Sequence, residues 1–240
     1  ARTNRNSSGI DLLCNLSGKT PLFDLLTDEG RRASWLVEVK TSSLPNAQLL
    51  GSAIGMRVME NVPYITGLDR FLGAGVNDAT RAYLKDMGAA AASNGAVGLY
   101  HLEKITPEAV EKERTLLRQG YQTYVIDESE LERVRKSYPI LWKRKEAEPK
   151  KCFIGCPHLS LQQLRWWTKK IPDALKAHGQ ERVKVETLFC TAPQVVERFR
   201  EFRVDYEKLT SSGAKLTSIC PLMYMNNPLS AKKAVITNSN

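Results

Sequence analysis

The chain of 240 residues lacks any long apolar stretch. No hydrophobic run approaches the ~20 residues that a helix needs to cross a bilayer, so a membrane-spanning helix is excluded and no membrane partner is expected. The first six residues are polar and lack the apolar segment of a secretory signal peptide. Internal repeats and low-complexity tracts are also missing, and 42% of the residues are hydrophobic, as in an ordinary globular protein.

Cysteine is scarce. The sequence has five cysteines, an odd number, and no Cys-x-x-Cys pair. So few cysteines in a chain of this length do not make a disulfide framework, and we therefore expect a reducing compartment, the cytoplasm. The sequence does not begin with methionine and ends directly after an apolar segment, so we also expect it to be a fragment of a longer protein.

The formal net charge is +9. Three explanations remain open: a solvated surface that meets a further domain, binding of small carboxylate or phosphate substrates, and binding of nucleic acid. The densest basic segment, residues 143–151, is interrupted by Glu146 and Glu148. This pattern is typical of a charged linker rather than of a stripe that follows a phosphate backbone, so nucleic acid is not an expected partner.

Short apolar segments alternate with segments of helical periodicity. Strands are expected at residues 35–39, 96–101, 121–126, 152–154, 183–189, 216–220 and 234–236. Helices are expected to begin after four N-cap residues, Asn77, Thr106, Asp127 and Ser160. The alternation predicts a layered α/β/α fold with mostly parallel sheets. We expect a first α/β half at residues 1–142, a charged linker at 143–151 and a second α/β half at 152–240.

Two further signals concern breaks in this pattern. Ser93-Asn94-Gly95 is a strong turn signal before the strand expected at residues 96–101. Pro172 is expected to end or restart the helix that begins after Ser160.

Two cysteines are each followed by proline, in Gly155-Cys156-Pro157-His158 and in Cys220-Pro221. Proline cannot continue a strand ladder or sit in a helix interior, so each thiol is predicted to lie at a turn that ends a strand. In parallel sheets such turns face the ligand cleft. The thiols could be metal ligands, buried small hydrophobic groups or nucleophiles. Cys14, Cys152 and Cys190 lie in apolar surroundings and are predicted to belong to the core.

Other candidate residues carry weaker signals. His101 ends an expected strand and His158 follows Cys156, so either imidazole could face a substrate or satisfy a turn. Arg2-Thr3-Asn4-Arg5 offers guanidinium groups that match carboxylate or phosphate, although a polar terminus gives the same pattern. Thr237-Asn238-Ser239 offers hydroxyl and amide donors at a sheet end or forms a plain turn.

Several separated motifs, in this order along nearly the whole chain, together carry a resemblance. They are Ala1-Arg2-Thr3-Asn4-Arg5, the block at residues 83–101, the helix start at 105–109, the segment 153–160 around Cys156, and Thr237-Asn238-Ser239. In this set the sequence resembles the catalytic (large) domain of the aconitase X family, whose fold is aconitase-like. The resemblance implies hydro-lyase activity on a hydroxy acid, with cis-3-hydroxy-L-proline the expected substrate and mevalonate 5-phosphate the alternative. A non-catalytic binding module is a second alternative.

The resemblance also implies a cofactor and a partner. The family uses iron, commonly in an iron–sulfur cluster held by three cysteines, and Cys156 and Cys220 match two of these positions. The third is expected outside this chain. A small swivelling domain or subunit, expected to supply a catalytic serine base, would also lie outside it, and the fragment alone is then expected to be inactive.

The roles that follow from the resemblance are expectations as well. His101 and His158 would be catalytic groups that orient the leaving hydroxyl or donate a proton. The substrate would be bound by a larger set of residues: Arg2, Asn4, Arg5, Ser93, Asn94, Asn238 and Ser239.

Overall fold

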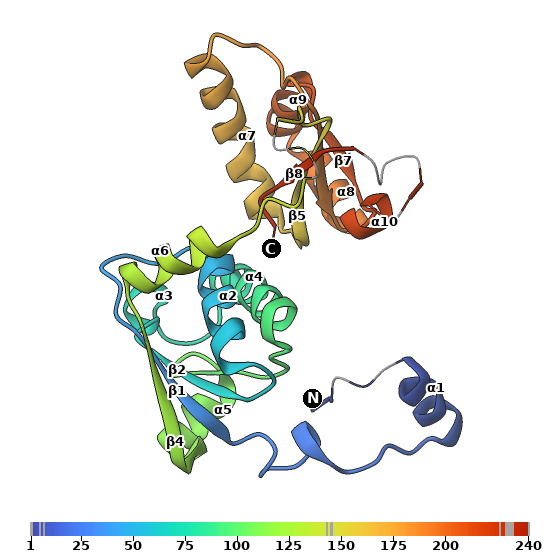
Figure 1. The fold of residues 1–240 in the computed structure, drawn as a ribbon. Coiled ribbons are helices and arrows are strands. Elements are labelled where there is room, and N and C mark those ends of the chain that lie inside the picture. The colour runs from blue at the N-terminus through green and yellow to red at the C-terminus, as the bar shows by residue number, and fades with distance from the viewer. Residues whose placement is uncertain are drawn as a thin grey trace. The chain divides into compact units, whose positions relative to one another are not determined.

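The computed structural model describes residues 2–4, 6, 8–142, 144, 146–225, 227–228 and 233–239. The chain divides into two compact units, Ala1–Tyr138 and Pro139–Asn240, and each is described by itself (Figure 1). The division follows Tyr138, whereas the sequence placed the end of the first half at residue 142. Among the described residues, no helix is both long and apolar enough to cross a membrane.

The first unit contains a four-stranded sheet in the order β3-β2-β1-β4, in which every neighbouring pair is parallel. Its strands are β1 (Ala33–Val39), β2 (Pro63–Thr66), β3 (His101–Leu102) and β4 (Leu117–Ile126). Its helices are α1 (Ser8–Ser17), η1 (Asp24–Leu26), α2 (Ala47–Val58), α3 (Asp69–Leu72), α4 (Asp78–Gly95), α5 (Pro107–Lys112), η2 (Glu113–Leu116) and α6 (Glu128–Ser137).

Side chains of the first sheet alternate between two cores. Trp35, Val37 and Val39 of β1 pack with residues of α2, α4 and α6, whereas Leu36 packs on the opposite face with Ala109 of α5. Successive side chains of a strand point to opposite faces, so each face is covered by its own layer. The first unit therefore has helices on both faces of a parallel sheet, as the sequence predicted.

Helices α2 and α4 approach so closely that only glycine fits at their crossing. A Cβ atom added at Gly95 would lie 1.9 Å from the Gly55 carbonyl oxygen, and one added at Gly51 would lie 2.1 Å from the Met87 carbonyl oxygen. This crossing explains why Ser93-Asn94-Gly95 is not a turn. The three residues form the last turn of α4, because Gly95 is needed against α2, and the chain leaves the helix at Ala96 in the left-handed region (φ 60°).

The second unit also contains a parallel four-stranded sheet, in the order β7-β6-β5-β8. Its strands are β5 (Lys151–Leu159), β6 (Glu186–Thr191), β7 (Lys215–Thr217) and β8 (Val235–Thr237). Its helices are α7 (Leu161–Ala177), α8 (Pro193–Glu201), α9 (Arg203–Ser211) and α10 (Pro221–Met225). Ile154 and Phe189 pack with Leu164, Phe199 and Leu209 of α7, α8 and α9, while Phe153, Leu188 and Cys190 pack on the other face.

Local signals along the chain had mixed outcomes. The caps at Asn77, Asp127 and Ser160 are confirmed, since each side chain accepts the amide hydrogen bond of a residue in the first turn. The strand expected at residues 96–101 is wrong, because only His101–Leu102 pairs with β2. The helix break expected at Pro172 is also wrong. Helix α7 continues through Pro172 to Ala177. It lacks only the backbone hydrogen bond that proline, which has no amide hydrogen, cannot donate.

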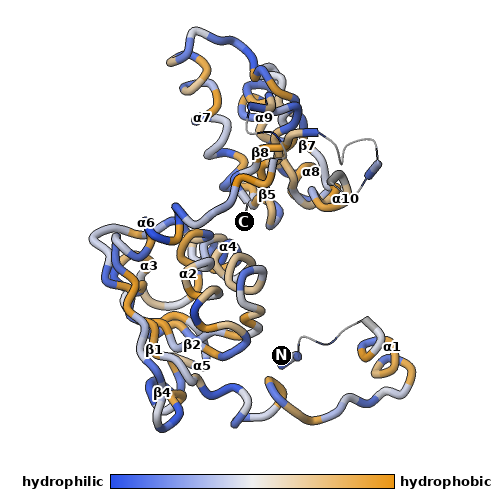
Figure 2. The backbone as a smooth tube through the Cα atoms, in the orientation of Figure 1, coloured by the Kyte–Doolittle hydropathy of each residue, from blue (hydrophilic) through white to orange (hydrophobic). Residues whose placement is uncertain are grey.

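Helix α1 does not pack as the sequence predicted. Leu12, Leu13 and Leu16 are 60%, 65% and 76% exposed, and Cys14 between them is only half-buried. Figure 2 shows this apolar helix on the outside of the first unit. The prediction that Cys14 belongs to the core is therefore wrong.

Candidate functional site

The Cys156 segment leaves the strand ladder in the middle of β5. Ile154 pairs with Phe189 and Leu159 pairs with Thr191, so four residues of β5 bulge out opposite a single residue of β6. Gly155 takes φ +111° and lies against the Cys190 carbonyl, where a side chain would not fit. Pro157 lacks an amide and follows a cis peptide bond. The predicted proline effect is thus present, but as a bulge within the strand rather than a turn after it.

The bulge is held at its far end by a buried threonine. The Thr191 hydroxyl donates a 2.6 Å hydrogen bond to the Leu159 carbonyl oxygen, and Thr191 is fully buried. His158, inside the bulge, is half-buried. The bulge therefore places Cys156 and His158 at the carboxyl edge of the second sheet, the edge at which its four strands end.

Cys220 comes to the same edge from β7. After Thr217, whose hydroxyl accepts the Ile219 amide at 3.2 Å, the chain turns and Pro221 begins α10. Cys220 is exposed at this turn. The Cys156 pKa is raised, first by burial and then by the negative charge that Cys220 carries when ionised. Strands β5 and β7 both pair in parallel with β6, so Cys156 and Cys220 lie at the same carboxyl edge of the sheet.

The end of β8 completes this edge. The Cys156 amide donates a 3.0 Å hydrogen bond to the Ser239 hydroxyl oxygen, and the Ser239 amide donates to the Thr237 hydroxyl oxygen at 3.0 Å. Asn238, between them, is exposed. The structure thus brings Cys156, Cys220 and Ser239 together at one sheet edge.

Cys190 is a neighbour of this edge that the sequence interpretation did not single out. It is fully buried among Phe153 and Leu188, as predicted for a core residue. Burial raises its pKa to about 11, with smaller contributions from Cys156 and Cys220. Its thiol is therefore protonated at neutral pH. Only the register of β5 and β6 places it here, so no local motif marks it.

The donor set at the edge agrees in part with an iron site. Cys156 and Cys220 supply two soft sulfur ligands of the kind that iron–sulfur centres use. Among the described residues, no group of three or more His, Cys, Asp or Glu side chains is arranged to hold a metal ion. The edge therefore offers two thiol ligands, and a further ligand would have to come from elsewhere.

His101 lies in the first unit and is almost completely buried, at 1% exposure. Its Nε2 is 2.8 Å from the Arg31 carbonyl oxygen, and its Nδ1 is 3.8 Å from Glu108 Oε2. Burial lowers the pKa of His101, so its ring is neutral near pH 7. In the neutral ring the Nε2 hydrogen is donated to the Arg31 carbonyl oxygen, so Nδ1 has no hydrogen to donate to Glu108.

Arg31 and Glu108 form the centre of a small charge network. Arg31 donates to the Glu108 carboxylate through Nε and Nη2, each at 2.8 Å, and this contact is the main reason that the Glu108 pKa is lowered. Arg2 lies 3.9 Å from the same carboxylate and forms an ion pair with Asp28. The guanidinium of Arg2, which was predicted to bind substrate, thus contacts carboxylates of its own unit.

The remaining predicted residues of the first unit are spread over two places. Asn4 donates to the Phe23 carbonyl oxygen at 3.1 Å, while its Oδ1 is buried with no partner among the described residues. Ser93 and Asn94 both donate to the Ala90 carbonyl oxygen within α4, at 3.1 Å and 2.9 Å. Arg5 lies outside the described residues.

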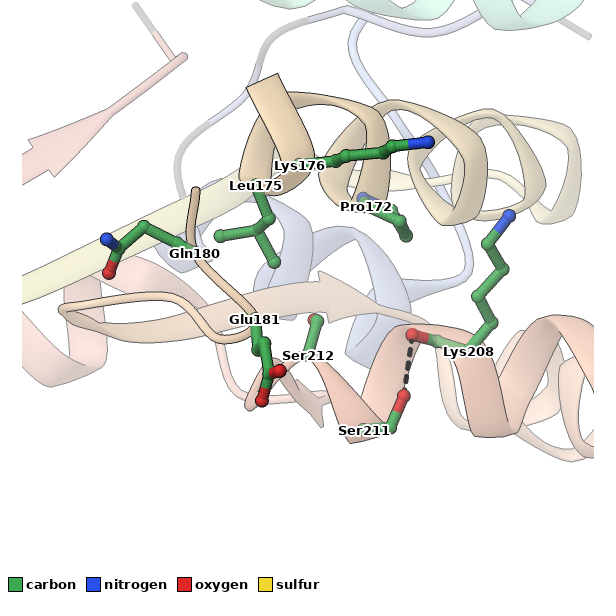
Figure 3. Close-up of a pocket in the computed structure, with 8 residues that line it drawn as sticks. All are labelled: Pro172, Leu175, Lys176, Gln180, Glu181, Lys208, Ser211 and Ser212. Carbon is green, nitrogen blue, oxygen red and sulfur yellow. Dashed lines mark hydrogen bonds between the residues drawn. The ribbon is translucent and has the colours of Figure 1, made fainter. Parts of the chain in front are cut away.

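A shallow groove of about 370 Å³ lies elsewhere in the second unit, between the ends of α7 and α9 (Figure 3). Its lining includes Lys176, Lys208 and Glu181, around the apolar side chain of Leu175. Helix α7 begins just after β5 ends, so its last turn lies toward the opposite end of the sheet from Cys156. The groove is therefore separate from the sheet edge that carries Cys156 and Cys220, which we call the thiol edge.

The charge excess is also unevenly divided. Counted along the sequence, residues 1–138 contain 17 Lys and Arg and 17 Asp and Glu, so the whole excess of nine lies in residues 139–240. The unit that carries Cys156 and Cys220 is therefore strongly basic, which favours anions near it.

Comparison with known proteins places this geometry in a family. Residues 33–136 match the aconitase X second domain. The chain is 32% identical to the phosphomevalonate dehydratase large subunit of Thermococcus kodakarensis over 82% of its own length and 46% of that protein. It is 27% identical to the cis-3-hydroxy-L-proline dehydratase of Pseudomonas aeruginosa over its full length and 40% of that protein.

A solved structure gives the same result for the fold. The crystal structure of Thermococcus kodakaraensis aconitase X in its holo-form superposes with a TM-score of 0.75 and 27% identity, over all of this chain and 56% of that one. The chain spans about half the length of these relatives. The fold is thus the aconitase-like α/β fold with parallel sheets, and the chain belongs to the aconitase X family.

Proposed function

We propose that this chain is a part of the catalytic region of a hydro-lyase that removes water from a hydroxy acid. The observation that carries the proposal is the placement of Cys156 and Cys220 at the same carboxyl edge of the second sheet, in a chain 32% identical to a dehydratase large subunit. In open parallel sheets the carboxyl edge is where ligands bind.

In the proposed site, Cys156 and Cys220 would hold iron, with a third ligand from outside this chain. When bound, iron supplies Lewis-acid stabilisation of the departing hydroxyl. His158, two residues from Cys156 in the same bulge, would donate the proton that makes the hydroxyl leave as water. The proton lost from the carbon next to the carboxylate would be taken by a base supplied by a small swivelling domain or subunit.

The substrate carboxylate needs cationic or amide donors, because charge grows on it as the neighbouring proton leaves. Asn238 is exposed beside the thiol edge and would serve this purpose. In the first unit, Asn4 is retained as a candidate from the sequence. Arg2 would contribute by exchanging Asp28 for the substrate, and Arg5, Ser93 and Asn94 are retained as candidates from the sequence. His101, the other predicted catalytic histidine, is buried against the Arg31 carbonyl oxygen and is retained as a candidate from the sequence.

Two substrates are proposed for the test. Identity does not rank them, since it is 32% and 25% to the phosphomevalonate dehydratase large subunits of Thermococcus kodakarensis and Aeropyrum pernix, and 27% to the cis-3-hydroxy-L-proline dehydratase of Pseudomonas aeruginosa. The basic second unit agrees with a substrate that carries phosphate in addition to carboxylate. Mevalonate 5-phosphate is therefore the first substrate to test, and cis-3-hydroxy-L-proline, which the sequence favoured, is the second.

The test uses the full-length protein with its small subunit, purified anaerobically and reconstituted with iron. We expect dehydration of one of the two substrates, and loss of both iron and activity in Cys156→Ser and Cys220→Ser. Cys14→Ser, in α1, is the matched control and should keep both. Full iron occupancy in Cys156→Ser, or no dehydration of either substrate by the reconstituted protein, would refute the proposal.

A further inference from the structure

The hydrogen bond between Cys156 and Ser239 joins two segments that are 83 residues apart in the sequence. The Cys156 amide donates to the Ser239 hydroxyl oxygen at 3.0 Å. This oxygen therefore already has a protein partner, whereas the hydroxyl hydrogen of Ser239 can still be donated elsewhere. Ser239 was expected to bind substrate, and this contact shows that its hydroxyl oxygen also holds the Cys156 amide.

The Cys156 segment needs such support because the ladder does not provide it. Between Ile154 and Leu159 the register with β6 is lost. Gly155, at φ +111°, has no side chain to anchor the segment, and Pro157 has no amide to donate. Thr191 holds the bulge only at its far end, through Leu159. The bond to Ser239 holds the backbone at the residue from which the thiol projects.

Ser239 is in turn well placed to hold the bulge. Strand β8 pairs with β5 through Val235, Ile236 and Thr237, and Thr237 is opposite Phe153. The Ser239 amide donates to the Thr237 hydroxyl oxygen at 3.0 Å, which fixes the residue after the strand ends. The position of Ser239 is therefore set by the same sheet that carries Cys156.

We propose that Ser239 is a positioning residue for Cys156: its hydroxyl oxygen anchors the Cys156 amide and so directs the thiol toward the metal. The identity of the metal in this inference rests on the proposed function. The hydrogen bond between Cys156 and Ser239 does not depend on it. Groups that orient a metal ligand without touching the metal commonly change metal affinity about 10- to 100-fold when they are removed.

The two possible tasks of Ser239 predict different results. If Ser239 positions Cys156, Ser239→Ala should lose iron faster than the wild type, whether or not its KM also rises. If Ser239 only binds substrate, the same variant should keep its iron and show a raised KM. Ser239→Thr keeps the hydroxyl acceptor and should restore iron retention under the first hypothesis.

The experiment measures iron release from the reconstituted full-length enzyme in the presence of a chelator, with KM measured in parallel. We expect release to be at least about 10-fold faster in Ser239→Ala than in the wild type. Ser211→Ala, the same substitution at an exposed position at the end of α9, is the matched control and should not change release. Unchanged release in Ser239→Ala, with or without a raised KM, would overturn the proposal.

A second measurement separates this inference from the proposed function. The rate at which iodoacetamide alkylates Cys156 in the iron-free protein can be followed by peptide mass spectrometry, with Cys152 as the internal reference. We expect several-fold faster alkylation of Cys156 in Ser239→Ala, and in Thr237→Val, because the bulge is no longer anchored. If the wild type binds no iron but the alkylation rates differ in this way, the proposed function fails and the positioning contact stands. Equal alkylation rates would refute the contact.

Discussion

Replacing Gly95 by alanine tests the closeness of α2 and α4, the crossing on which the first unit depends. The added Cβ atom would lie 1.9 Å from the Gly55 carbonyl oxygen and 2.7 Å from the Gly55 Cα atom. Ordinary contact between such atoms requires about 3.5 Å, so the helices would have to separate by roughly 1.5 Å at this point. The obstacle is backbone, which cannot move aside as a flexible side chain can.

The magnitude follows from two opposing effects. Overpacking of a core costs about 1–3 kcal/mol, and a backbone obstacle places this substitution at about 3 kcal/mol. Alanine is favoured over glycine in a helix by up to about 1 kcal/mol, less at the last helical residue. We therefore expect a net loss of about 2 kcal/mol in the free energy of unfolding of the first unit.

Hydrogen–deuterium exchange can measure this loss unit by unit. A loss of about 2 kcal/mol raises the population of the open state about 30-fold, so amides of α2 and β1 should exchange faster by that factor. Amides of α7 in the second unit serve as the internal reference. Gly9→Ala is the matched control, since a Cβ atom there meets nothing within 4 Å. Exchange in Gly95→Ala that equals or is slower than wild type would refute the close crossing.

Two further predictions concern the same unit. Ala96→Gly should stabilise it by about 0.5–1 kcal/mol, because Ala96 is exposed and ends α4 at φ 60°, where a Cβ atom is unfavourable; a lower midpoint of urea unfolding would contradict this. Glu108→Gln should cost about 2 kcal/mol at pH 7, because it removes the charged partner of Arg31. Since the folded-state pKa of Glu108 is lowered, its contribution exists above the unfolded pKa of about 4.3 and is lost as the pH falls through the folded pKa. The difference between wild type and variant should therefore shrink between pH 5 and pH 3 in urea unfolding, and a constant difference would refute the assignment.

The parts of the fold that were predictable from the sequence depend on neighbouring residues. Asn77, Asp127 and Ser160 cap helices through amides only three residues away, so a short window of sequence contains both partners. The alternation of strands and helices that indicated parallel sheets is similarly a property of segment order.

The sequence-based predictions fail where a segment that is distant in the sequence determines the local structure. Gly95 looks like a turn residue in its own window, but it belongs to a helix because Gly55 lies against it. The leucines of α1 have the spacing of a buried face, yet spacing alone does not show whether another segment covers them. Cys190 was assigned to the core correctly, but its nearness to Cys156 depends on the pairing of β5 with β6, which no motif within either strand contains.

The thiol edge combines both kinds of information. Proline after a cysteine acts locally: it stops the ladder at Cys156 and begins a helix after Cys220, so both thiols had to lie where strands are interrupted or end. That the two interruptions lie at one edge requires β5, β6 and β7 to be parallel neighbours, which places the carboxyl ends of all three strands together. The bond from Cys156 to Ser239 requires β8 on the other side of β5 as well. A motif search therefore finds the candidate ligands of such a site but not the residues that would position them, because strand order determines which residues lie beside them.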